Sequence, residues 1–80
     1  MPIVHVPGDL IGYTGGLDEI AVDAPRVLEL KSALDARFPG LGARLDQLAV
    51  AIDGQIYNQA DYEVLGPDSE LHFVPPIAGG

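Results

Sequence analysis

The residues best suited to chemistry lie at the C-terminal end, which reads Pro75-Pro76-Ile77-Ala78-Gly79-Gly80. Glycine lacks a Cβ atom, so the backbone of another protein or a nucleotide can approach this ending closely. Consecutive prolines favour an extended conformation, and six extended residues span roughly 18–20 Å. Such a stalk could carry a carboxylate into a narrow active site, where adenylation would turn its oxygen into a leaving group. We therefore expect Gly80, together with Gly79, to be the reacting terminus.

Two terminal glycines are weak evidence when taken alone. A chain with ten glycines in eighty residues ends in Gly-Gly by chance roughly once in sixty-four times, with composition as the base rate. Chain termini also fray without having any function. The ending gains its weight from the Pro-Pro stalk and from the lack of another recognisable site.

Conventional catalytic and metal-binding patterns are missing from the sequence. There is no cysteine, which removes disulfides, thiolate metal sites and a cysteine nucleophile. Ser32 and Ser69 lie outside any Gly-x-Ser-x-Gly elbow, and residues 8–16 lack the Gly-Lys-Ser/Thr of a phosphate-binding loop. The acids within residues 61–70 match no calcium-loop spacing and are interpreted as a solvated rim. We expect neither a self-contained active site nor a metal site.

Charge and hydropathy narrow the range of partners. Twelve acids against four bases give a net charge of −8, which repels phosphate backbones and argues against nucleic acid binding. The charge serves solubility, and it could also steer the protein towards a basic partner. The longest apolar run, residues 48–52, is too short for a membrane span or a signal core. We expect a cytoplasmic protein with no membrane partner.

Alternating β-branched and aromatic residues predict five strands. They cover residues 3–6, 19–23, 48–52, 55–57 and 70–74. The glycine-rich residues 8–16 are interpreted as a hairpin loop, and Asp53-Gly54 is a strong tight-turn signal. Between the second and third strands, a helix is expected to begin at Asp23 as N-cap, with Pro25 in its first turn, and to end at Pro39-Gly40.

These elements predict an α+β fold of the β-grasp (ubiquitin-like) type. One mixed sheet of four to five strands would pack on one helix, with the first and last strands parallel and adjacent in its middle. Residues 1–74 would form this body and residues 75–80 the extended tail. The apolar stripe of the helix consists of Val27, Leu30, Leu34 and Phe38.

Strand alternation places His5 and His72 on the face of the sheet that points away from the core. A metal site would need a third ligand, which the sequence does not offer. We interpret the two histidines as partner contacts or as plain solvent-exposed residues.

The ending Phe73-Val74-Pro75-Pro76-Ile77-Ala78-Gly79-Gly80 resembles that of the small β-grasp sulfur carriers, a family that includes the molybdopterin synthase small subunit (MoaD) and the thiamine sulfur carrier (ThiS). The third strand and the start of the helix add to the likeness. The resemblance implies that a ubiquitin-activating-type adenylyltransferase uses ATP to adenylate Gly80, which is then converted to a thiocarboxylate. It implies a non-catalytic co-substrate that binds no permanent cofactor.

The resemblance also implies an acceptor enzyme, such as the large subunit of molybdopterin synthase, into which the tail would insert. The expected partner contacts are Pro7, His72, Val74, Pro75, Pro76, Ile77 and Ala78. The chain departs from the family pattern at Leu10-Ile11 and in the turn at Pro67-Asp68-Ser69-Glu70. Tyr13-Thr14-Gly15-Gly16 is more similar to carriers that serve other pathways, including cysteine biosynthesis.

Three alternatives to molybdopterin synthesis therefore stay open. The first is a sulfur carrier for thiamine, cysteine or another pathway. The second is a ubiquitin-like modifier that forms isopeptide bonds, whose self-linked chains could use only Lys31, the one lysine. The third is a plain β-grasp interaction module with an incidental Gly-Gly end.

Overall fold

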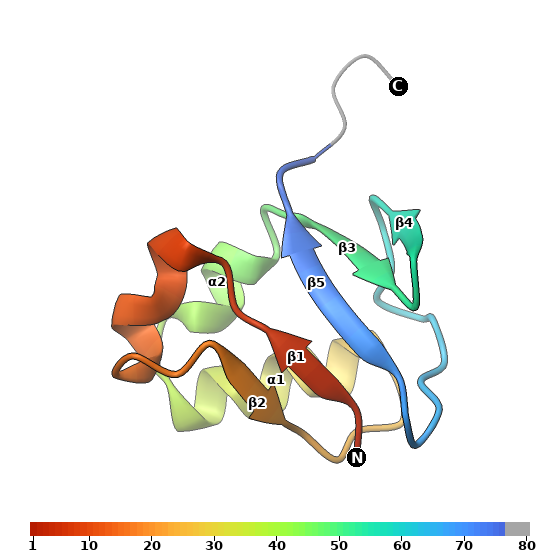
Figure 1. Ribbon diagram of the computed structural model, residues 1–80, viewed down its shortest axis with the longest axis horizontal. Helices are drawn as coiled ribbons and strands as arrows, with labels where there is room; N and C mark the ends of the chain where they lie inside the picture. The colour runs from red at the N-terminus through yellow and green to blue at the C-terminus, as the bar shows by residue number, and fades with distance from the viewer. Residues whose placement is uncertain (77–80) are drawn as a thin grey trace.

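Five strands form one sheet in the computed structural model, which describes residues 1–76 (Figure 1). The strands are β1 (Ile3–His5), β2 (Glu19–Ala21), β3 (Ala49–Ile52), β4 (Gln55–Tyr57) and β5 (Glu70–Val74). Their order across the sheet is β2-β1-β5-β3-β4, with β1 and β5 parallel and the other neighbours antiparallel. The first and last strands thus lie side by side in the middle, and the predicted β-grasp fold is confirmed.

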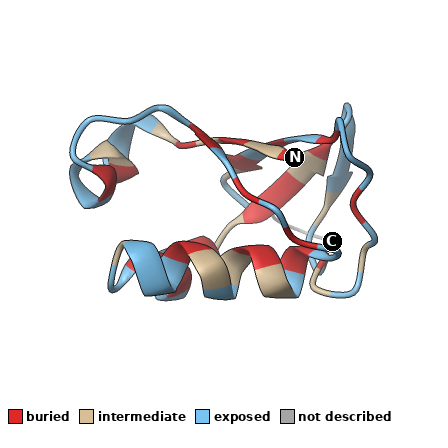
Figure 2. Cartoon of the chain, turned by 90° about the horizontal axis from the view of Figure 1, so that it is seen from below, coloured by how far each residue is buried: buried red, intermediate tan, exposed pale blue. Residues whose placement is uncertain are grey.

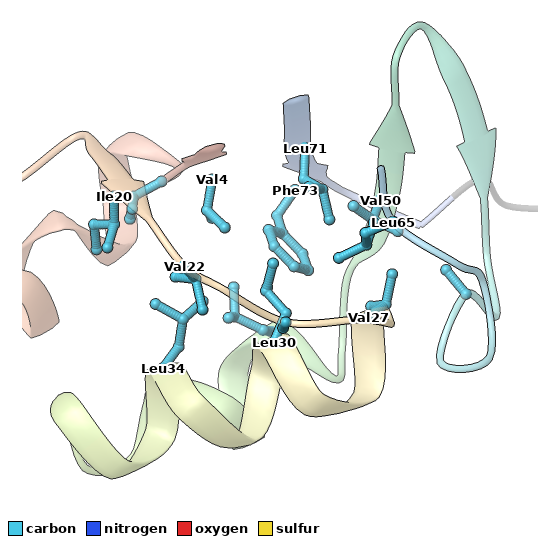
Figure 3. Packing of buried hydrophobic residues seen from close by; sticks show 14 of the residues in the cluster. Val4, Ile20, Val22, Val27, Leu30, Leu34, Val50, Leu65, Leu71 and Phe73 are labelled. Carbon is cyan, nitrogen blue, oxygen red and sulfur yellow. The ribbon is translucent and has the colours of Figure 1, made fainter. Parts of the chain in front are cut away.

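Helix α1 (Val27–Arg37) forms a second layer beneath the sheet (Figure 2). Val27, Leu30 and Leu34 lie on one side of α1 and are 0 % exposed, because they pack against side chains from the sheet (Figure 3). Leu71 and Phe73 of β5 face them from the opposite layer (Figure 3). Burying each such aliphatic side chain stabilises the fold by about 1.5–3 kcal/mol. Phe38, the last member of the predicted stripe, is only partly buried at the edge of this core.

The start of α1 differs from the prediction. Arg26 is the N-cap, in an extended conformation (φ −142°, ψ 167°), so Asp23 does not cap the helix and Pro25 precedes it. Residues 25–27 instead pair with the segment before β5: Leu65 N–H donates to Pro25 at 2.9 Å, and Val27 N–H donates to Glu63 at 3.2 Å. Because backbone carbonyls satisfy the first helical N–H groups, α1 needs no side-chain cap.

Residues 8–16 form more than the predicted hairpin loop. Residues 8–14 make a short 3-10 helix, η1 (Gly8–Thr14), which buries Leu10 and Thr14. The Thr14 hydroxyl lies 3.0 Å and 2.7 Å from the carbonyl oxygens of Ile11 and Leu17 and shares its hydrogen between them. Gly15 and Gly16 then turn the chain into β2 at φ +68° and +99°, values that disfavour a side chain. The sequence pattern predicted a turn in this segment, but it did not predict that Leu10 would be buried.

Some predicted strands are one or two residues too long at their ends. β1 ends at His5, β2 ends at Ala21 and β3 begins at Ala49. A second short helix, α2 (Leu41–Leu45), follows α1 and packs against it. Asp53 and Gly54 adopt positive φ (48° and 88°) in the tight turn that was predicted between β3 and β4. Within residues 1–76, none of the helices is both long enough and apolar enough to cross a membrane.

Asp35 fastens the junction between α1 and α2. Its Oδ1 accepts hydrogen bonds from the backbone N–H groups of Gly40 (3.2 Å) and Gly42 (3.0 Å). A Cβ atom at Gly42 would lie 2.8 Å from the Cβ of Asp35, which cannot rotate away. The close approach of these two segments therefore requires glycine at this position.

We predict that Gly42→Ala lowers the free energy of unfolding by about 1–3 kcal/mol, as overpacking does elsewhere. The better helix propensity of alanine is too small an effect to offset a clash with an immobile carbon atom. Urea unfolding would measure the change. Gly12→Ala is the matched control, because a Cβ atom there meets nothing within 4 Å. Equal stability of the two variants would refute the close approach.

Candidate functional site

The root of the tail lies at the end of the central strand. β5 ends at Val74, which is half-buried, and Pro75 and Pro76 follow as exposed residues (Figure 1). The predicted reactive residues Gly79 and Gly80 and the predicted contacts Ile77 and Ala78 lie outside the described residues 1–76, so their roles stay predictions.

The parallel pairing of β1 and β5 determines what surrounds this root. His5 is paired with His72, and each strand then runs towards the same end of the sheet. Pro7 and Val74 therefore come two residues beyond the paired histidines on neighbouring chain segments. On the other side of β5, Ala49 pairs directly with Val74. The described members of the predicted contact set are thus brought together.

The two histidines stack on the face of the sheet that points away from α1. This confirms the prediction that they share the face opposite the core. Their ring centroids are 4.0 Å apart and their planes differ by 3°. Neighbouring strands lie roughly 4.7–4.9 Å apart. His5 and His72 are directly paired, so their two flat rings stand side by side at about this distance and lie face to face. The His5 side chain is 25 % exposed, whereas His72 is an exposed residue.

Two carboxylates bracket the His5 ring. Its Nε2 lies 2.9 Å from Oε1 of Glu70, and its Nδ1 lies 3.9 Å from Oε1 of Glu19. An ionised Glu70 only accepts hydrogen bonds, so Nε2 of His5 carries the hydrogen in this contact. The pair of glutamates holds one ring in place, and the stack in turn orients His72.

The strand register extends this arrangement into a row of five side chains across the sheet. We call it the open-face row; it consists of Glu19, His5, His72, Ala51 and Ile56. One end is acidic, the centre is aromatic, and the other end is apolar, with Ile56 50 % exposed. Glu19, Ala51 and Ile56 were missing from the predicted contact set. Alternation could have placed them on this face, but their alignment needs the register.

This face is suited to binding. Within residues 1–76, no three His, Cys, Asp or Glu side chains are grouped so that they could hold a metal ion. The histidine pair is occupied by its own stack and by the glutamates. What the face offers is a combination of charge, aromatic surface and apolar surface beside the tail root.

The fold and this exposed tail root define a ubiquitin-like β-grasp protein. The ThiS family model matches residues 4–80, so the chain belongs to this family. The members of the ThiS family are small, non-catalytic sulfur carriers. The match covers nearly the whole chain, the Gly79-Gly80 ending included. A comparison with curated protein sequences finds no match.

Solved structures support the fold. A chain in the crystal structure of the Amycolatopsis orientalis BexX/CysO complex is 22 % identical to this one, with a TM-score of 0.86 over the full length of both chains. Mycobacterium tuberculosis CysO, described as an antigen, is 15 % identical with a TM-score of 0.85, over 96 % of this chain and all of that one. At these identities the likeness establishes the fold alone.

We predict that His72→Leu shifts the ring-proton signals of His5 downfield in an NMR spectrum, because a stacked aromatic ring shields the protons above its face. The reciprocal variant His5→Leu should shift the signals of His72 in the same direction. Pro67→Ala, a change in the turn before β5, serves as a control. Unchanged histidine signals in both histidine variants would contradict the stack.

Proposed function

We propose that this protein is a sulfur carrier whose terminal carboxylate at Gly80 is the site of chemistry. A ubiquitin-activating-type adenylyltransferase would transfer AMP from ATP to the carboxylate. The terminal sulfur of a persulfide on the partner would then attack the carbonyl carbon; a C–S bond forms, the C–O bond to AMP breaks, and an acyl disulfide results. A second thiol of the partner would cleave the S–S bond of this acyl disulfide, so that a disulfide forms on the partner and the thiocarboxylate is released. The acceptor enzyme would take the sulfur and return the carboxylate.

The observation that carries this proposal is the extent of the family match. It spans the body and the Gly79-Gly80 ending together. The described body supports the proposal because it presents a binding face beside the tail root. A carrier of this kind is a co-substrate, and ATP is bound by its partner.

Two acceptors are proposed. The large subunit of molybdopterin synthase is the first, because the Pro-Pro and Gly-Gly ending resembles that of the small subunit of this enzyme. An acceptor in cysteine biosynthesis is the second, because the loop Tyr13-Thr14-Gly15-Gly16 is similar to carriers of that pathway. Incubating the thiocarboxylate form with each acceptor enzyme and its substrate would decide between them by the product that gains sulfur.

We predict that co-expression with the activating partner and a sulfur donor increases the intact mass of the protein. The increase should equal the mass of a sulfur atom minus that of the oxygen atom it replaces. Intact-mass spectrometry measures this change. Deletion of Gly80 should abolish it, whereas Gly12→Ala should leave it intact. A mass change that survives the deletion would disprove a terminal thiocarboxylate, and a ladder of covalent adducts on a denaturing gel would support the modifier alternative instead.

We predict that His72→Ala weakens binding to the activating partner about fivefold to tenfold, as expected for a contact worth somewhat more than 1 kcal/mol. The variant removes the aromatic centre of the open-face row without touching the core. Tyr62→Ala is the matched control, because Tyr62 is 76 % exposed but lies outside the row. Surface plasmon resonance would measure both affinities. Equal losses in the two variants would mean that the open face is not the docking surface.

A further inference from the structure

Lys31, the one lysine of the sequence, is held between two carboxylates. Its Nζ donates to Oδ1 of Asp46 at 3.0 Å and to Oδ1 of Asp61 at 2.9 Å. Lys31 lies on α1, Asp46 directly follows α2, and Asp61 belongs to the connection between β4 and β5. One ammonium group therefore joins three segments that are distant in sequence. The Lys31 side chain is only 12 % exposed.

This environment favours the charged form of the amine. Burial lowers the pKa of Lys31, but the hydrogen bonds to Asp61 and Asp46 and the attraction of their charges outweigh it, so the pKa lies above the ordinary value. A protonated amine has no lone pair with which to attack a carbonyl carbon. Each unit by which the pKa rises reduces the reactive, neutral fraction about tenfold at a given pH below it.

The approach to Lys31 is also unfavourable for an activated acyl group. The amine borders a cavity of about 470 Å³ that is lined by Lys31, Asp46, Asn58, Gln59, Asp61 and Tyr62. An acyl donor that approaches Nζ through this cavity meets both carboxylates. An acyl adenylate carries a negatively charged phosphate, which the carboxylates repel.

We propose that Asp46 and Asp61 protect Lys31 from acylation, so that the protein is a poor acceptor for activated carboxyl groups, its own C-terminus included. The reaction that they suppress is an acyl transfer. A neutral Nζ would form an amide C–N bond, the C–O bond of the acyl donor would break, and the amine would release a proton. The importance of this protection for the cell rests on the proposed function, because only an activated terminus makes self-linkage a hazard.

The protection has a direct consequence for the modifier alternative. Self-linked chains of this protein could form through a lysine side chain only at Lys31. Because Asp46 and Asp61 hold that amine, it does not attack the activated C-terminus of another copy of the protein. The activated copy therefore remains available for transfer of its terminal sulfur.

The experiment is acetylation of the purified full chain with the N-hydroxysuccinimide ester of acetic acid, followed by peptide mass spectrometry. We expect Lys31 to react several-fold more slowly than the lysine introduced by Arg37→Lys, which replaces an exposed cation on the last turn of α1. Combining Asp46→Asn with Asp61→Asn should accelerate acetylation of Lys31 several-fold. The pair Asp9→Asn and Asp68→Asn is the control, because it removes the same charge from exposed sites elsewhere.

Two results would overturn the proposal: a Lys31 that reacts as fast as the introduced lysine, or equal acceleration by both pairs of substitutions. Circular dichroism would establish that the variants are folded, and the single variants Asp46→Asn and Asp61→Asn would replace an unfolded double variant. No activating partner, ATP or sulfur donor is present in this experiment. Its outcome is therefore independent of whether Gly80 is ever adenylated.

Discussion

The parallel pairing of β1 with β5 is the contact on which the rest of the structure depends. It joins residues from the two ends of the chain, since Ile3 is paired with Glu70 and His5 with His72. Parallel neighbours cannot be joined by a tight turn, so the chain between them must cross over one face of the sheet. Here α1 lies on that face and covers it (Figure 2). The same pairing places the end of β5 in the middle of the sheet, flanked by β1 and β3, and leaves the opposite face free.

The two faces of the sheet consequently have different tasks. The face over α1 buries Val4, Leu71 and Phe73 and supplies the stability of a small domain. The other face has the open-face row, whose two histidines contact each other, one of them also contacting the carboxylates of Glu19 and Glu70, without contributing to the core. A substitution on the open face can therefore alter recognition while the fold persists. This separation suits a protein that is recognised by partner enzymes.

The fold could be predicted from local patterns, because alternation and the apolar stripe of α1 report directly on which residues face the core. The same patterns correctly placed His5 and His72 on one exposed face. They failed where distant segments decide the outcome. The start of α1 depends on the pairing of Arg26 with Val64, and the protection of Lys31 depends on Asp46 and Asp61, which lie 15 and 30 positions away. The reacting terminus was inferred from residue types and family likeness, and the structure describes only its root.

The sheet ends on both sides in strands of only three residues, β2 and β4. An exposed strand edge offers unpaired backbone groups to which another chain can add, and short edge strands limit this addition. Such edges give a second copy little backbone with which to pair. For a small sulfur carrier, edges of this kind limit strand addition between copies even where the protein is concentrated.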